Sequence, residues 1–329
     1  MLRMQPFHVE MPTHMDEVTK ILHTHGETAK ICAGGTDVVP NMKHGLHEPG
    51  VLVHLNRVKE LQGIHDCGDT IRIGAMTPLH QIATSPLILE CAPGLAKAAK
   101  SVAGPQLRRM GTIGGNLCLD TRCLYYNQTY FWREALGFCL KKDGTKCHVV
   151  ERGKKCVAAA SNDTATMLLC LDAHVTLQSV EGERRIALED FYVADGIKNT
   201  VRAENELLTS VEFPKGHEHR LEGFSKLRHR QSIDYSMLSV GVRFDLDDQT
   251  IVNSKVVVSA LAARPKVVTS LECHGQPLNE QTIQALSEKG RKQCHPLTNI
   301  CDDPLWRKDM VAVYIRRACE TVERAMRNK

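Results

Sequence analysis

Two glycine-rich turns constrain the fold of this chain more than any other feature of its sequence. The first, residues 33–37 (AGGTD), follows a β-like run at residues 29–33 and precedes a short helical pattern that begins at about Asp37. The second, residues 111–116 (GTIGGN), lies some 80 residues later. Paired glycines let backbone N–H groups converge on an anion, so both turns are candidates for binding a phosphate or pyrophosphate. Neither contains the G-x-G-x-x-G pattern of a Rossmann site, and either turn alone is more simply explained as a chain reversal.

The composition excludes several classes of protein. With 329 residues, 42% of them apolar, the chain is long enough for two domains. Its net charge of +4 is spread along the sequence, which argues against nucleic-acid binding. We find neither the apolar stretch of a signal peptide nor the ~20 apolar residues of a membrane span. We therefore expect a soluble, cytoplasmic protein.

The hydrophobic patterns predict an α+β fold. Short β-like runs alternate irregularly with helical patterns before residues 215–220 (KGHEHR), a polar stretch that is the best candidate linker. We place the domain boundary near Gly216, which predicts domains at residues 1–216 and 217–329. In the second domain the patterns predict strands at 235–246 and 251–261 and helices near 281–289 and 304–326.

Cysteines cluster in a region without periodicity. Five of the thirteen fall between positions 118 and 156, inside residues 117–158, which the pattern predicts to be one long loop. The loop also contains six of the chain's fifteen aromatic residues and eight basic residues. This composition suits an anionic iron–sulfur cluster, since basic side chains offset its charge and aromatic side chains exclude water. Four thiolates also suit zinc, and the spacings of 16, 8 and 9 residues between Cys123, Cys139, Cys147 and Cys156 fit no generic motif. The residues alone leave both metals open.

The order of the motifs resembles a known family. AGGTD, IGAMT and TIGGN, in this order and at this separation, resemble the FAD-binding subunits of molybdenum hydroxylases, the xanthine dehydrogenase and carbon monoxide dehydrogenase group. The resemblance implies a PCMH/VAO-type FAD-binding domain of two α+β subdomains and a C-terminal α+β domain like that of the CO dehydrogenase flavoprotein. It extends to Ser161-Asn162-Asp163 and to residues 224–228 (FSKLR), and it implies that Lys226 lies near the isoalloxazine ring. The implied FAD-binding residues are Lys30, Ile31, Cys32, Ala33, Gly34, Gly35, Thr36, Asp37, Val102, Thr112, Gly114, Gly115, Asn116, Asp163 and Lys226.

The cysteine loop resembles the inserted loop of the β subunits of 4-hydroxybenzoyl-CoA reductases. That resemblance implies a [4Fe–4S] cluster held by four cysteines, namely Cys123, Cys139, Cys147 and Cys156. Cys118 follows the second glycine turn directly and suits a small packed residue better than a ligand. His148 and the other histidines, including His229, show no metal-binding spacing, so we expect them at the surface.

The resemblance implies an electron-transfer subunit with no catalytic residue of its own. Partner subunits would supply the molybdenum cofactor and the [2Fe–2S] clusters, and electrons would pass from a carrier such as ferredoxin through [4Fe–4S] and FAD to the partners. We expect a dimer of heterotrimers, with 4-hydroxybenzoyl-CoA reductase as the leading interpretation. One alternative is the flavin subunit of a related aldehyde, xanthine or N-heterocycle dehydrogenase or hydroxylase. Another is a zinc-stapled binding protein without flavin, which predicts a colourless preparation.

Overall fold

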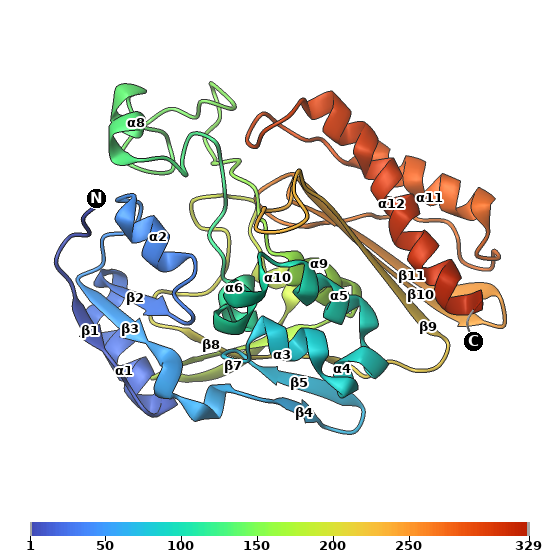
Figure 1. Cartoon of the computed structure of the whole chain (residues 1–329), viewed down its shortest axis with the longest axis horizontal. Helices are drawn as coiled ribbons and strands as arrows, with labels where there is room; N and C mark the ends of the chain where they lie inside the picture. Colours follow the sequence, from blue (N-terminus) through green and yellow to red (C-terminus); the bar gives the residue numbers. More distant parts are fainter. Residues whose placement is uncertain (1, 328–329) are drawn as a thin grey trace.

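Three β-sheets organise the chain in the computed structural model, which describes residues 2–327 (Figure 1). The first sheet is parallel, with the strand order β1-β3-β2. Helix α1 packs on it through Val18 and Leu22, which are buried with Val53 of β3. The elements of this part are β1 (His8–Glu10), α1 (Met15–His25), β2 (Ala29–Cys32), α2 (Val38–Lys43) and β3 (Val51–His54), with 3₁₀ turns at Gly26–Thr28, Leu55–Arg57 and Lys59–Leu61.

The second sheet is antiparallel, with the strand order β4-β5-β8-β6-β7. Its strands are β4 (Ile64–Asp66), β5 (Thr70–Gly74), β6 (His174–Ser179), β7 (Gly182–Ala187) and β8 (Leu207–Pro214). Its helices are α3 (Leu79–Thr84), α4 (Pro86–Cys91), α5 (Pro93–Ser101), α6 (Pro105–Met110), α7 (Ile113–Leu117), α9 (Asp163–Cys170) and α10 (Leu188–Phe191). Every residue of α9 is buried, because other elements cover this helix on all sides.

The third sheet is antiparallel, with the strand order β12-β11-β10-β9, and lies between two helical layers. Helix α12 contacts β9 and β10 on one face, whereas α5 and α9 pack on the other. A Cβ atom at Gly241 would lie 2.8 Å from the sulfur of Met167 in α9, and one at Gly223 would lie 2.1 Å from the carbonyl oxygen of Ala318 in α12. The elements are β9 (Arg220–Leu227), β10 (Leu238–Asp247), β11 (Thr250–Ser259), β12 (Lys266–Val267), α11 (Glu280–Gln293) and α12 (Pro304–Arg327).

These elements confirm the α+β prediction, including the two long strands and two helices expected after the linker. The polar stretch at residues 215–220 connects β8 of the second sheet to β9 of the third. None of the helices within residues 2–327 has the length and apolarity needed to cross a lipid bilayer.

The cysteine-rich segment is more ordered than the single loop that its sequence predicts. It contains one helix, α8 (Tyr130–Ala135), and Figure 1 shows it in green as an excursion beside α2. Arg133 of α8 is almost fully buried, donates to Asp143 at 3.0 Å and to the carbonyl oxygen of Gly45 at 3.0 Å, and lies near the Phe138 ring. A buried guanidinium is costly unless its charge is paired and hydrogen-bonded. Arg133 therefore holds the cysteine-rich segment against Gly45, just after α2.

Glu222 makes the stability of the third sheet dependent on pH. It lies opposite Arg243 in the β9–β10 pair, accepts the Gly94 N–H at 3.0 Å, and has its pKa raised by burial from 4.5 to about 7. A raised acid pKa means that the protonated carboxyl stabilises the fold below pH 4.5 and that this stabilisation is lost as pH rises through 7.

We predict that Glu222→Gln, which keeps the acceptor for Gly94, removes this loss. Above neutral pH the variant should be more stable than the parent by about 1–2 kcal/mol, less than the full shift implies because Glu222 is only partly shielded from water. Thermal unfolding between pH 4.5 and 8.5 measures the difference. Glu183→Gln on the exposed face of β7 is the control, and parallel profiles for Glu222→Gln and the parent protein would contradict the assignment.

Candidate functional site

The two glycine-rich turns pack against each other backbone to backbone. A Cβ atom at Gly34 would lie 1.9 Å from the carbonyl oxygen of Met110, so only glycine permits this approach. A Cβ atom at Gly115 would lie 3.7 Å from that of Ala33. Gly35 has a φ of +71°, the left-handed conformation that L side chains rarely adopt. The turns therefore form one structural unit that joins the first sheet to helices α6 and α7.

The backbone donors of the two turns are used differently. In the second turn, the N–H groups of Ile113 and Gly114 donate to the carbonyl oxygens of Thr77 and Ala75, at 3.0 and 2.8 Å. The Gly115 N–H donates to the Thr112 hydroxyl at 3.1 Å. In contrast, the N–H groups of residues 34–37 form no hydrogen bond with any other part of the described chain. The first turn thus offers a set of free amides to an anion, whereas the second is a structural platform.

A cavity of about 370 Å³ opens beside these turns. It is lined by every predicted FAD-binding residue except Cys32, including the distant Val102, Asp163 and Lys226. Cys32 is buried and packs with Met42 and Leu52. Its side chain therefore lies outside the cavity that the resemblance assigns to it.

A buried ion pair forms part of the cavity wall. The ammonium nitrogen of Lys226 lies 2.5 Å from the Asp163 carboxylate, and each side chain is 4% exposed. Ser236 donates its hydroxyl to the other oxygen of Asp163. The Ser161 hydroxyl lies in the same wall, buried and without a hydrogen-bond partner among the described residues. Since buried hydroxyls are almost always paired, Ser161 is fitted to a polar atom of a bound molecule.

Asp37 locks the first turn to two distant segments. Its carboxylate accepts hydrogen bonds from Arg122 at 3.1 Å, from the Tyr235 hydroxyl at 3.0 Å and from Asn41 at 2.9 Å. The Arg122 guanidinium also lies 3.7 Å from the centre of the Tyr235 ring. Burial raises the pKa of Asp37, and the charge of Arg122 opposes that rise. The sequence did not indicate these partners, since Arg122 and Tyr235 are remote from Asp37 along the chain.

A second, smaller cavity is lined by Cys123, Cys139, Cys147 and Cys156, so the structure brings the four predicted ligands together. Backbone N–H groups of Val150 and Ala158 point at the sulfurs of Cys147 and Cys156, each at 3.4 Å. Burial raises the pKa of the Cys123 thiol to about 11, with the other three cysteines adding to the rise. Cys118 lines the larger cavity instead. His148 is exposed, as expected.

Among the described residues, no three of these four sulfurs all lie within 4.8 Å of one another. Tetrahedral zinc with Zn–S bonds of about 2.3 Å holds its sulfurs about 3.8 Å apart. Within residues 2–327, the only three Cys, His, Asp or Glu side chains with ligand atoms all within 4.8 Å of one another are His229, Cys301 and Asp302. A four-iron cluster places iron and sulfide between its thiolates and fits a wider set, and N–H donors directed at the sulfurs are typical of such sites.

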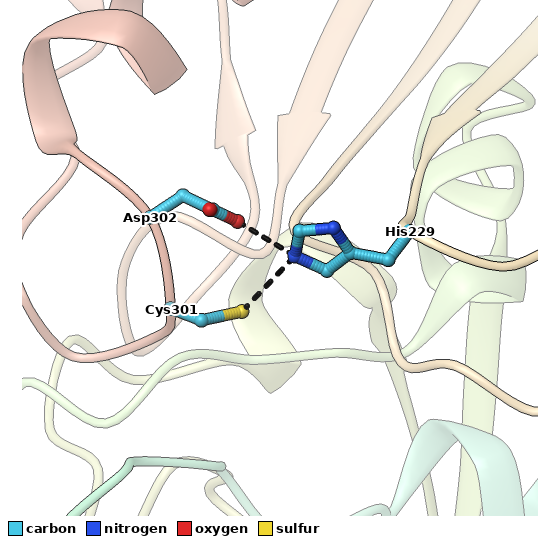
Figure 2. Close-up of side chains that lie close together, drawn as sticks. All are labelled: His229, Cys301 and Asp302. Carbon is cyan, nitrogen blue, oxygen red and sulfur yellow. Dashed lines mark hydrogen bonds and ion pairs between the residues drawn. The ribbon is translucent and has the colours of Figure 1, made fainter.

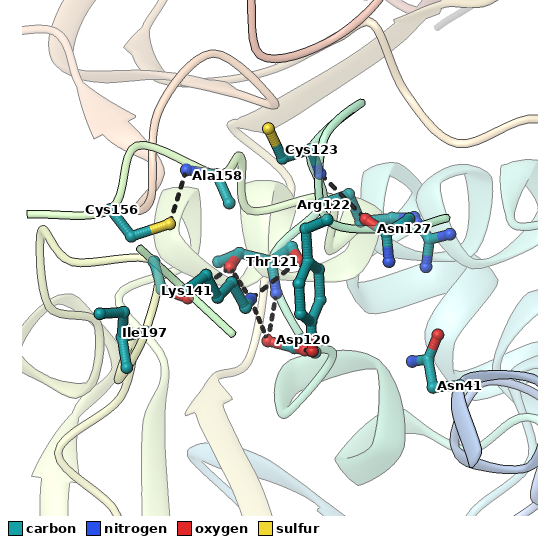
Figure 3. A network of polar contacts seen from close by, with 12 residues as sticks. Asn41, Asp120, Thr121, Arg122, Cys123, Asn127, Lys141, Cys156, Ala158 and Ile197 are labelled. Carbon is teal, nitrogen blue, oxygen red and sulfur yellow. Dashed lines mark hydrogen bonds and ion pairs between the residues drawn. The ribbon is translucent and has the colours of Figure 1, made fainter. Parts of the chain in front are cut away.

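A buried polar link connects the two cavities. Asp120 lines the larger cavity, Lys141 lines the smaller one, and their charged groups are 2.6 Å apart (Figure 3). The Tyr126 hydroxyl donates to the second oxygen of Asp120 at 2.9 Å. Burial acts to raise the pKa of Asp120, but the charge and hydrogen bond of Lys141 hold this pKa below its usual value. No periodicity or motif marks Asp120 and Lys141, so sequence analysis missed both.

One histidine also departs from the surface position expected for it. His47 lines the larger cavity, 3.8 Å from Asp120, and burial lowers its pKa to about 4. It is therefore neutral at physiological pH and adds no charge to the cavity.

Comparison with known proteins agrees with this geometry. Residues 5–216 match the family described as FAD binding domain in molybdopterin dehydrogenase, and residues 223–322 match the CO dehydrogenase flavoprotein C-terminal domain. The chain is 25% identical to the carbon monoxide dehydrogenase medium chain of Hydrogenophaga pseudoflava over 95% of both chains. It is 29% identical to the nicotinate dehydrogenase FAD-subunit of Eubacterium barkeri, over 74% of this chain and 71% of that protein.

A solved structure shows the same fold. Carbon monoxide dehydrogenase from Hydrogenophaga pseudoflava, in a form lacking the Mo-pyranopterin moiety, superposes with a TM-score of 0.80 at 24% identity. The match covers 98% of this chain and 99% of that chain. The implied architecture of an FAD-binding domain and a C-terminal flavoprotein domain is therefore confirmed.

We predict that Gly35→Val weakens FAD binding. An L side chain held at a φ of +71° is strained by roughly 1–2 kcal/mol, which corresponds to about a tenfold loss of affinity if the turn must keep this shape. Gly275→Val is the matched control, because Gly275 has a φ of +78°, no atom near its Cβ position and no part in the cavity. Flavin titration of both variants, stripped of cofactor, measures the effect. Equal affinities would show that the first turn does not hold the flavin.

Proposed function

The chain belongs to the family of FAD-binding subunits of molybdopterin dehydrogenases, and we propose that it carries FAD in the larger cavity and a [4Fe–4S] cluster in the smaller one. One observation carries the flavin assignment: the free amides of residues 34–37 and the buried Lys226–Asp163 pair line the same cavity. An anionic pyrophosphate suits the amides, and the cationic side of the pair would favour the negative charge that the flavin ring gains on reduction.

FAD, when bound, supplies exchange between one- and two-electron transfers. The chain's own residues bind and orient it. The amides of residues 34–37 would hold the pyrophosphate, Lys226 would place a positive charge at the cavity wall, and the Ser161 hydroxyl would pair with a polar atom. Leucine side chains exclude water from the remaining wall, namely Leu22, Leu55, Leu79, Leu107, Leu119, Leu207 and Leu208.

The relatives favour a dehydrogenase or hydroxylase over a reductase. The similar proteins include a carbon monoxide dehydrogenase and a nicotinate dehydrogenase, so we assign this chain to an enzyme that oxidises its substrate in another subunit. That subunit would contain the molybdenum cofactor, a further one would contain the [2Fe–2S] clusters, and two such heterotrimers would form the complex. Among the described residues none of the thirteen cysteines forms a disulfide, which supports the proposal of a cytoplasmic location.

The four-cysteine cavity favours a second candidate, a reductase of the 4-hydroxybenzoyl-CoA type that receives electrons from ferredoxin. An added cluster suits the acceptance of low-potential electrons, whereas electrons leaving an oxidised substrate do not need it. Assays of the intact complex distinguish the two. Oxidation of carbon monoxide, an aldehyde or an N-heterocycle with an artificial acceptor supports the dehydrogenase. Reduction of 4-hydroxybenzoyl-CoA by reduced ferredoxin supports the reductase.

We predict that Cys123→Ser, Cys147→Ser and Cys156→Ser each remove the cluster and leave the flavin. Each variant should lose roughly four irons, the acid-labile sulfide and the broad visible absorption, because a Cys₄ cluster needs its four thiolates. FAD should remain, since the cluster cavity lies outside the flavin cavity. Cys118→Ser, which alters the wall of the flavin cavity, is the control and should retain the iron. One zinc and no acid-labile sulfide in the parent protein would contradict the cluster and show that the four cysteines bind structural zinc.

A further inference from the structure

Three side chains of different chemistry converge on one point near the flavin cavity. His229 lies just after β9, and Cys301 and Asp302 precede α12 (Figure 2). The Nε2 atom of His229 is 2.8 Å from a carboxylate oxygen of Asp302 and 3.8 Å from the sulfur of Cys301. All three ligand atoms lie within 4.8 Å of one another. The sequence predicts a surface position for His229. It gives no sign of this group, because Cys301 and Asp302 lie about 70 positions away from His229.

The backbone is shaped to bring these donors together. Successive side chains of an extended strand point in opposite directions, but Asp302 has a φ of +73°, and this turn directs both Cys301 and Asp302 at His229. The same segment is anchored on both sides. Asn299 donates to the carbonyl oxygen of Val157 at 2.6 Å, and the fully buried Arg307 donates to that of Ala260 at 2.8 Å. These two hydrogen bonds hold in place the segment that contains Cys301 and Asp302.

We propose that His229, Cys301 and Asp302 bind a divalent zinc ion. A set of imidazole nitrogen, thiolate sulfur and carboxylate oxygen suits zinc, whereas Mg²⁺ and Ca²⁺ require oxygen ligands. Tetrahedral zinc places such atoms about 3.3–3.6 Å apart, so the His229–Asp302 separation would open by about half an ångström and the His229–Cys301 separation would close slightly. The His229 and Asp302 side chains are 58% and 32% exposed, which leaves the fourth position open to water.

The ion would join three parts of the molecule. His229 begins a segment whose residues Ile233, Asp234 and Tyr235 line the flavin cavity, and Tyr235 holds Asp37 of the first glycine turn. On the other side, the carbonyl oxygen of Asn299 accepts the N–H of Leu124, next to Cys123. Zinc at this point would therefore fix the segment over the flavin cavity to residues 299–302, which in turn hydrogen-bond to the cysteine-rich segment.

Alkylation of individual cysteines tests this site in the full-length protein. Zinc should protect Cys301 from iodoacetamide, and a chelator should reverse the protection, as measured by mass spectrometry of the Cys301 peptide. Cys67 is exposed on the turn between β4 and β5, and its unchanged alkylation is the internal control. His229→Ala and Asp302→Asn should each need more than about tenfold more zinc for the same protection, since even changes around metal ligands cost that much affinity.

Two outcomes would overturn the site. One is equal alkylation of Cys301 with and without zinc in the parent protein, and the other is full protection in both variants. Circular dichroism verifies that the variants are folded, which their partly exposed positions favour. Because alkylation is measured on the Cys301 peptide, the result does not depend on whether the four-cysteine cavity holds iron or zinc. Failure here leaves the flavin and cluster proposals untouched.

Discussion

The close contact between the backbones at Gly34 and Met110 is the constraint on which the rest of the site depends. No side chain fits at position 34, because its Cβ atom would overlap the Met110 carbonyl oxygen. This contact brings the end of β2 in the first sheet against α6 and α7 of the second subdomain. The flavin cavity opens along this junction, and Gly114 supports it by packing tightly on Ala75. A bulkier residue at position 34 would therefore push the first sheet away from the end of α6 before it touches a ligand.

The two turns look alike in sequence but have different physical roles. The second turn uses its amides to hold Thr77 and Ala75, so its glycines serve packing. The first turn keeps its amides free because Gly35, in the left-handed region, directs the chain away from the ladder of β2. Only their hydrogen bonds distinguish a turn with free amides from one whose amides are paired, since both contain the same Gly-Gly pair.

Local features of this protein were predictable from its sequence, and long-range partners were not. The glycine turns, the clustered cysteines and the periodic elements after residue 220 follow from local patterns, and the structure contains them. The contact of the Cys32 side chain with Met42 and Leu52, outside the cavity lining, was not predictable from the motif. The Asp37–Arg122 and Asp120–Lys141 pairs join segments that only the tertiary fold brings together. His229 lies at the surface as expected, but the approach of Cys301 from a distant loop could not be predicted from the sequence.

Two partly buried ion pairs offset the charges of two aspartates that line the larger cavity, Asp37 and Asp120. Asp37 with Arg122 and Asp120 with Lys141 each combine opposite charges, so the wall between the cavities has no net charge from these four groups. Coulomb interactions are stronger in a protein interior than in water because the effective dielectric constant is lower, so any charge held by the cysteine cavity acts on both Lys141 and Asp120. Asp120 in turn faces the larger cavity. The wall that separates the two sites is therefore also the route by which a charge in one affects the other.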